Sequence, residues 1–473
     1  MARLNRRQAI FLGASIGVAG AASYLASKLI GPGSALVPGR SRAKPFEGDA
    51  ELPKQADVVI IGGGDIGTAA AYYLAKSGLS VALCEKGLIG GEGSSRSVGH
   101  VLCLGESGDK LQFIAQSKAM WPSLNAELQV ETGYRQDGLI LKIANEEERV
   151  FWEDWLKAAK DVEPGTRLLS PSEIGDIVRT SAPWHGAVYS PTDGRAEPTL
   201  VAPAFATAAR RLGANVLTSC AVRGIETSGG RLSSVVTEHG AIRTRTAVLA
   251  GGAWSSTFMH NLHLDLPSSK QFSWCASFRT KTEGPKGNGI YNNTTWRRQI
   301  DGGYCTSLMS VTYPILPESF RNWRQSLAAA KALALGDSGW TVEPRLGRYF
   351  LDDLFAKSTW QLDEVTPFEK RRVLEPEVNK DVVNAALREN ATEISDFRNL
   401  EAYDAWGGVT CMMSDMNPSL GAVASVPGLL IATSFAEGLT LAPAAGALIR
   451  DMVTGARAAI NIAPFAWDRF SKS

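Results

Sequence analysis

The sequence lacks an excess of charge of either sign. Its 473 residues carry 49 Lys and Arg against 48 Asp and Glu, a formal net charge of +1. Nucleic acid attracts proteins through a positive field, so this balance argues against nucleic acid as a partner. The 44% hydrophobic content is that of an ordinary globular protein. The length predicts two domains, or one large domain with insertions.

Residues that bind metals are also scarce. The chain has 5 histidines and 6 cysteines, and the cysteines are scattered without a C-x-x-C pair. The one close histidine pair, His260 and His263, has no third ligand beside it in the sequence. Zinc sites and disulfide scaffolds show denser spacing, so we expect free thiols and no metal site.

Long hydrophobic runs are rare, and the main one lies near the N-terminus. Arg3, Arg6 and Arg7 precede an uncharged stretch over residues 9–27. Paired arginines before such a stretch are typical of a twin-arginine export signal, and residues 1–30 are predicted to be this signal or a retained membrane anchor. The anchor is favoured. It would place the body of the protein on the periplasmic face of a bacterial inner membrane, with residues 31–55 as a linker.

A dinucleotide-binding pattern begins after the linker. The apolar run at residues 57–61 predicts a buried strand, and Gly62, Gly64 and Gly67 follow it in the spacing G-x-G-x-x-G before a helical stretch. Gly62 suits the tight turn, Gly64 a close approach to pyrophosphate, and Gly67 the packing of helix on strand. Glu85 ends the next predicted strand, about 20 residues on, where such folds place the acid that binds ribose.

Asp65 interrupts this pattern. A carboxylate at the start of a helix suits the helix dipole. The same charge would repel pyrophosphate if it faced the ligand, so we expect the side chain of Asp65 to point outward.

The segments that follow resemble the FAD-binding segments of the D-amino-acid-oxidase-like superfamily. Their order along one chain carries the resemblance: residues 90–96 (GGEGSSR), 193–198 (DGRAEP), 247–254 (AVLAGGAW), 415–421 (DMNPSLG) and 437–443 (EGLTLAP). Within the superfamily, nearly the whole chain resembles the bacterial membrane-bound L-amino acid deaminases. The N-terminal segment, the motif at residues 91–96 and a long insertion before the last flavin segment carry this narrower resemblance.

The resemblance implies an α/β fold with a Rossmann-type FAD-binding domain, a mixed-sheet α+β substrate domain and an insertion subdomain. The predicted FAD domain comprises residues 55–115, 195–265 and 400–473. The predicted substrate domain comprises residues 116–194 and 266–399, including the insertion at about 317–375. A hairpin is expected at residues 231–245, where two alternating stretches flank a glycine turn.

The family pattern also implies the residues of the two sites. Those expected to bind FAD are Gly62, Gly64, Gly67, Glu85, Lys86, Gly91, Ser94, Ser95, Arg96, Val222, Gly251, Gly252, Gly438, Leu439 and Thr440. Arg297 matches the arginine that binds the substrate carboxylate in the deaminases, a role suited to its planar fork. Without the resemblance, Arg297 and Arg298 would be interpreted as a solvated strand.

Three further residues are expected at the catalytic site. His100 matches a position close to the flavin, although a lone histidine is more often structural. Trp274 is a candidate for the pocket wall, although such a residue is more often part of the core. Glu437 departs from the neutral or aromatic residue of the family, and we expect it to favour substrates with a basic side chain.

The leading hypothesis is therefore FAD-dependent oxidative deamination of an L-amino acid to a 2-oxo acid and ammonia. Hydride would pass from Cα to flavin N5, and a membrane quinone or cytochrome would take the electrons. The first alternative is another FAD-dependent amine or amino acid dehydrogenase or oxidase, acting on a D-amino acid, an opine or a cyclic secondary amine. The second is a non-catalytic flavoprotein subunit that relays electrons.

Overall fold

The computed structural model describes residues 43–314 and 354–470, together with residues 316, 324, 327, 341–345 and 349. The predicted signal or anchor at residues 1–30 lies outside the described residues, as do most of the linker and much of the insertion predicted at 317–375. No helix in the described ranges has the length and apolar character needed to cross a membrane.

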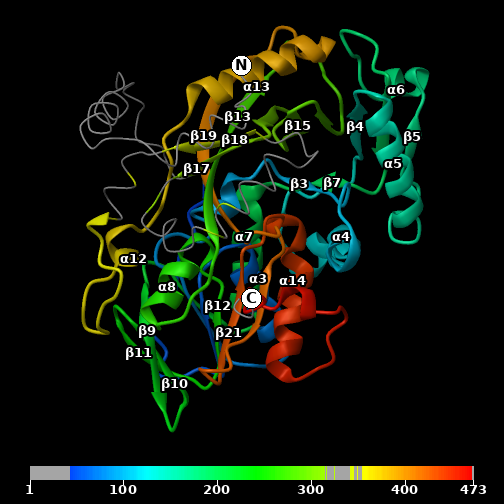
Figure 1. The fold of residues 1–473 in the computed structure, drawn as a ribbon. Coiled ribbons are helices and arrows are strands. Elements are labelled where there is room, and N and C mark those ends of the chain that lie inside the picture. Colours follow the sequence, from blue (N-terminus) through cyan, green and yellow to red (C-terminus); the bar gives the residue numbers. More distant parts are fainter. Residues whose placement is uncertain are drawn as a thin grey trace.

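A six-stranded sheet forms one half of the molecule (Figure 1). Its strands, in spatial order, are β20 (Ser419–Ala422), β21 (Leu429–Thr433), β12 (Ala247–Leu249), β1 (Val58–Ile61), β2 (Val81–Cys84) and β8 (Asn215–Leu217). All neighbours are parallel except β20, which pairs antiparallel with β21. The predicted Rossmann-type α/β unit is thus confirmed.

The helices of this half pack around α3 (Asp65–Lys76). This helix follows β1, and its residues from Asp65 to Ala75 are buried. It packs against α7 (Pro198–Arg211) and α14 (Gly438–Thr454), and α14 also packs against α4 (Gly108–Leu128). The other helices of the described residues, in both halves, are α5 (Glu146–Ala159), α6 (Pro171–Ile177), α8 (Ser255–Asn261), α12 (Pro367–Lys370) and α13 (Lys380–Glu393), with 3₁₀ turns η1 (Gly93–Arg96), η2 (Gly252–Trp254), η3 (Ser395–Phe397) and η4 (Ala463–Phe465).

Helix α14 contains Pro443 in its interior. Proline removes a helix hydrogen bond and strains its neighbours. Here the Ser117 hydroxyl of α4 donates to the Thr440 carbonyl at 2.6 Å and accepts from the Ala444 N–H at 3.3 Å. A side chain from a neighbouring helix therefore supplies partners at the proline, and the helix continues through it.

A larger mixed sheet forms the other half of the molecule, with α13 lying along it (Figure 1). Its strands are β18 (Thr341–Arg345), β17 (Ser310–Pro314), β13 (Ser269–Arg279), β16 (Tyr304–Leu308), β15 (Thr294–Arg298), β14 (Asn288–Tyr291), β4 (Leu139–Ile143), β6 (Gly186–Ser190) and β5 (Arg167–Leu169), and β19 (Glu401–Met412) pairs with β13. β19 lies within the range 400–473 that the sequence assigned to the FAD domain, but it pairs along the length of β13 in the larger sheet.

Two smaller sheets complete the fold. The hairpin predicted at residues 231–245 is confirmed: β10 (Arg231–Thr237) pairs antiparallel with β11 (Gly240–Arg243), and β9 (Val222–Ser228) joins them. β3 (His100–Val101) pairs with β7 (Gly194–Arg195).

The core follows the alternation of side chains along β1. Val58 and Ile60 pack with the helices on one face of the six-stranded sheet. Val59 and Ile61 pack on its other face, with the three-stranded sheet β9–β11 and α8. Trp360 and Phe368, from the end of the predicted insertion, join this second cluster. The six cysteines are buried free thiols, as expected.

Candidate active site

A cavity of about 390 Å³ lies between the two large sheets. Its lining starts at the carboxyl ends of β1, β12 and β21 and extends to Ser273 of β13 and residues 408–411 of β19. The crevice beyond the carboxyl ends of parallel strands is where open α/β sheets bind their ligands. The cavity therefore joins a dinucleotide-type crevice to a wall supplied by the second sheet.

The glycines of the first turn divide into two kinds. Gly62 has φ +116°, and a Cβ there would lie 2.4 Å from the Ala250 carbonyl oxygen. A Cβ on Gly67 would lie 2.0 Å from the Gly62 carbonyl oxygen, so this glycine permits close packing of helix on strand. Gly64 lines the cavity, and its added Cβ would meet only the Ser94 hydroxyl, at 3.0 Å. Gly64 thus leaves room for a ligand.

The expectation that Asp65 points outward is wrong. Its side chain is 3% exposed and lines the cavity, and its Oδ1 atom is buried without a hydrogen-bond partner. Because α3 is packed between other helices and the sheet, its first turn has no outward face. Burial raises the pKa of the Asp65 carboxyl to about 7, against the lowering effect of the Ser94 hydroxyl.

Glu85 lies after β2 at the edge of the cavity. Its Oε2 accepts from the Gly63 N–H and its Oε1 from the Gly87 N–H, both at 2.7 Å. Burial raises the pKa of this carboxyl. The two backbone bonds fix its orientation and leave further lone pairs for the hydroxyls of a ribose.

The loop containing η1 is held together by Glu92, which sequence analysis did not select. Its Oε1 accepts from Lys86 Nζ at 2.7 Å and from the Leu374 N–H at 2.6 Å, and both its oxygens accept from Trp254 Nε1. Arg96, on the same loop, pairs with Glu375 at 2.6 Å. The segment around Leu374 and Glu375 is distant in sequence, so no local signal indicated these contacts.

Most of the predicted FAD-binding residues share this one cavity. The lining includes Gly62, Gly64, Glu85, Lys86, Gly91, Ser94, Arg96, Val222, Gly251, Gly252, Gly438, Leu439 and Thr440, together with His100 and Glu437 from the predicted catalytic set. Gly67 and Ser95 do not line it. Gly67 lies in the packed turn, and the Ser95 hydroxyl is directed to the Glu92 carbonyl at 3.4 Å.

His100 lies at the cavity and bonds to the larger sheet. Its Nε2 is 3.2 Å from the Trp296 carbonyl oxygen, so this nitrogen carries the proton in the neutral ring. Burial lowers the pKa of His100 to about 4, although the Trp296 carbonyl works in the other direction. The side chain is therefore uncharged at neutral pH.

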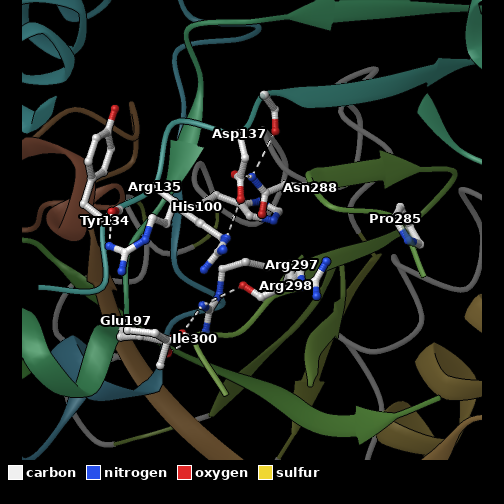
Figure 2. Close-up of polar contacts among 12 residues, drawn as sticks. His100, Tyr134, Arg135, Asp137, Glu197, Pro285, Asn288, Arg297, Arg298 and Ile300 are labelled. Atoms are coloured by element: carbon white, nitrogen blue, oxygen red, sulfur yellow. Dashed lines mark hydrogen bonds and ion pairs between the residues drawn. The ribbon is translucent and has the colours of Figure 1, made fainter. Parts of the chain in front are cut away.

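Arg297 does not line the cavity, and this differs from the role that the resemblance implied. The side chain is 2% exposed, and its NH1 and NH2 atoms pair with Glu197 at 2.8 and 3.1 Å (Figure 2). Glu197 also accepts from the Ile300 N–H at 2.7 Å. With its fork occupied by an internal carboxylate, Arg297 is not placed to bind a substrate carboxylate in this arrangement.

The guanidinium of Arg297 instead supports the cavity wall from behind. Its Nε donates to the Val98 carbonyl, and a Cβ on Gly99 would lie 2.8 Å from that nitrogen. Val98, Gly99 and His100 all line the cavity. Arg298, the next residue on the strand, points the other way and reaches Glu283 at 3.4 Å.

Trp274 is a core residue in this structure, which corrects its placement at the pocket wall. It is 4% exposed, does not line the cavity, and its Nε1 donates to the Glu377 carbonyl at 2.8 Å. Side chains alternate along β13, so the preceding residue, Ser273, faces the cavity instead.

Glu437 lines the cavity just before α14, but its charge has a partner. Its Oε1 accepts from Lys110 Nζ at 3.0 Å, and Lys110 also pairs with Glu106 at 3.1 Å. The Oε2 atom is buried without a partner. Burial raises the pKa of Glu437, while Lys110 opposes that rise. Lys110 lies far from Glu437 in the sequence, which gives no signal of the pair.

The residues present fit an extended dinucleotide with a tricyclic ring. Gly64 leaves open space at the N-terminus of α3, where the backbone N–H groups favour phosphate. Glu85 suits a ribose, and residues 249–254 and 432–440 complete a long lining that reaches the second sheet. Within the described residues, no group of three or more His, Cys, Asp or Glu side chains is placed to hold a metal ion.

Comparison with known proteins gives one consistent family. Residues 57–452 match the family described as DAO, FAD dependent oxidoreductase. The solved structure of L-amino acid deaminase from Proteus myxofaciens in complex with anthranilate is 33% identical, with a TM-score of 0.87 over 92% of this chain and 98% of that chain. The L-amino acid deaminase from Proteus vulgaris is 32% identical, with a TM-score of 0.86 over 90% of this chain and 100% of that chain. Glycine oxidase from Bacillus licheniformis is 26% identical over 85% of this chain and 94% of its own length.

Proposed function

The chain belongs to the DAO family of FAD-dependent oxidoreductases, and on that premise we propose that it deaminates L-amino acids oxidatively to 2-oxo acids and ammonia. The observation that carries the proposal is the likeness to the Proteus L-amino acid deaminases, which extends over almost the whole of those chains. The cavity supports it, because it brings the dinucleotide crevice against a wall from the second sheet.

In the proposed reaction, FAD supplies the hydride acceptor. Gly64, Glu85, Lys86 and the glycines at 251 and 252 would hold its dinucleotide portion, and the lining from Gly438 to Thr440 would hold part of its ring system. Val98 and Leu102 give the adjoining wall an apolar surface. Such a wall excludes water and orients Cα, and positioning of this kind carries much of the rate in dehydrogenation.

The protein also has to recognise the substrate carboxylate. The two cations of the described lining, Lys86 and Arg96, are paired with Glu92 and Glu375. Transfer of Arg297 to a substrate would leave Glu197 as an unpaired buried charge, a change that costs about 3–5 kcal/mol. We therefore assign to Arg297 the role of positioning Val98–His100. Direct binding of the substrate carboxylate is assigned to other residues that line the cavity.

The proposal extends to the electron acceptor and the location. Residues 9–27 would anchor the chain in a bacterial inner membrane, with the catalytic body on the periplasmic face, and a membrane quinone or cytochrome would reoxidise FAD. These parts rest on the sequence pattern of the N-terminus. Stoichiometric hydrogen peroxide from the detergent-purified enzyme, without another acceptor, would instead indicate an ordinary oxidase.

The deciding experiment is anaerobic bleaching of the bound flavin by a panel of substrates. We expect L-amino acids to bleach it, and D-amino acids, glycine, sarcosine and proline to leave the spectrum unchanged. The similarity to glycine oxidases supports a second candidate, oxidation of glycine or another small amine. Bleaching by glycine or sarcosine in preference to L-amino acids would establish that candidate, and no bleaching by any amine would favour an electron-relay subunit.

A further inference from the structure

The first residue of α3 places a carboxyl group beside the part of the cavity that suits phosphate. Asp65 lies directly after Gly64, lines the cavity and is 3% exposed. Its backbone N–H donates to the Ser94 hydroxyl oxygen at 2.9 Å. The Oδ1 atom is buried with no partner. The chain thus brings a potential negative charge to the place where a dinucleotide carries its own negative charges.

Among the residues that the structure describes, no cation faces Asp65 to compensate such a charge. The other charged groups and the histidine that line the same cavity have partners of their own. Lys86 pairs with Glu92, Arg96 with Glu375, and Glu437 with Lys110. Glu85 accepts from two backbone N–H groups, and His100 bonds to the Trp296 carbonyl. The adjacent strands β1 and β12 carry no charged residue. The helices packed on α3 carry theirs near their C-terminal ends: Arg210 and Arg211 on α7, and Arg450 and Asp451 on α14.

Ionisation of Asp65 in the FAD complex would be unfavourable for two reasons. One of its oxygens would be a buried anion without a donor, and its charge would repel the phosphates. As a neutral acid, the same group has one proton to donate, and phosphate oxygens are strong acceptors. Burial already raises the pKa of this carboxyl to about 7, and added phosphate charge raises it further.

We propose that Asp65 binds FAD as a neutral carboxylic acid that donates its proton toward the pyrophosphate, so that cofactor binding takes up one proton from solvent above neutral pH. Asp65 is then a cofactor-binding residue in its acid form. The inference requires FAD, which the family establishes, and does not depend on which amine is oxidised.

The sign of the pH effect follows from linkage. Below the pKa of the free protein, Asp65 is protonated with and without FAD, and the FAD affinity is constant. Above it, the free protein loses a proton that the FAD complex keeps, so the Kd for FAD rises by up to about tenfold per pH unit. The rise ends at the higher pKa of the complex.

The test measures FAD binding to the full chain between pH 6 and 9, by flavin fluorescence, in the absence of substrate. We expect the wild-type Kd to rise above about pH 7 and Asp65→Asn to bind with a nearly constant Kd. Asp109→Asn is the matched control, because Asp109 lies in the first turn of α4 and is exposed. It should follow the wild type. An Asn variant with the wild-type slope would overturn the proposal.

Calorimetry in buffers of different ionisation enthalpy provides a second readout on the wild type alone. We expect uptake of about one proton per FAD near pH 8, and the same uptake with ADP, which carries the pyrophosphate without a flavin. No uptake with FAD, or uptake with FAD but not with ADP, would overturn the proposal. If Asp65→Asn fails to fold, Asp65→Ser replaces it. Failure of the deaminase proposal would leave these binding results unchanged.

Discussion

The two sides of the cavity are built in different ways. On the dinucleotide side, a few neighbouring residues define the geometry: Gly62, Gly64 and Gly67 follow one strand, and Glu85 follows the next. On the side of the larger sheet, contacts join distant segments, as in the Arg297–Glu197 pair. On the first side, Gly62 and Gly67 permit close packing of the backbone, and Gly64 leaves space for a ligand. The second is organised by buried charges that must find partners, and it should respond far more strongly to the loss of one side chain.

The largest expected effect comes from the buried pair. Arg297→Ala would leave Glu197, which is 6% exposed, without its cation. Loss of one partner of a buried pair destabilises by about 3–5 kcal/mol. We expect a loss of this size in urea unfolding, with a strongly reduced kcat/KM. Arg298→Ala is the matched control, since Arg298 is partly exposed, its partner Glu283 is exposed, and a pair of this kind is worth below about 1 kcal/mol.

A double variant separates the two possible roles of Arg297. In Arg297→Met/Glu197→Gln, neither position of the pair carries a charge, and the glutamine oxygen still accepts from the Ile300 N–H. For a positioning residue, the double variant should regain most of the lost stability and part of the lost kcat/KM. Recovery of stability with no recovery of activity would show instead that Arg297 binds the substrate carboxylate.

The next effect tests the open space on the dinucleotide side. In Gly64→Leu, the first side-chain atom meets only the Ser94 hydroxyl, and the rest enters the cavity. We expect the fold to survive and FAD affinity to fall by about 1–3 kcal/mol, roughly fivefold to 150-fold in Kd. Gly175→Leu is the control, because no atom lies within 4 Å of its added Cβ. Full FAD occupancy in Gly64→Leu would contradict the assigned cofactor position.

The difference between local patterns and contacts of distant segments explains which features can be predicted from the sequence. The G-x-G-x-x-G turn, its flanking strands and the hairpin near residue 231 are local patterns, and the structure contains all of them. The sequence does not reveal the burial of Asp65, because that burial depends on α7 and α14, which pack against α3 from distant parts of the chain. The sequence does not show that Ser273 rather than Trp274 faces the cavity, because alternation along a strand does not reveal which face meets the cavity.

The partners of Arg297 and Glu437 were beyond the reach of sequence patterns for a related reason. A motif can identify a cationic or acidic side chain. Whether that charge is available to a ligand depends on whether the fold places a residue of opposite charge beside it. Glu197 lies 100 positions from Arg297 along the chain, and Lys110 lies 327 positions from Glu437. Only the assembled structure shows that both charges are already paired.

The smallest expected effect concerns Glu437 and substrate preference. Because Lys110 already compensates its charge, Glu437 offers a basic substrate much less attraction than a free carboxylate would, about 1 kcal/mol or below. Glu437→Gln should therefore raise the KM for lysine or arginine only a few-fold relative to leucine or phenylalanine. Glu106→Gln is the control, since Glu106 shares Lys110 without lining the cavity, and it should leave the ratio unchanged. Equal KM changes for all four substrates would remove Glu437 from specificity altogether, whereas a hundredfold change would mean that Lys110 turns away from Glu437 when substrate binds.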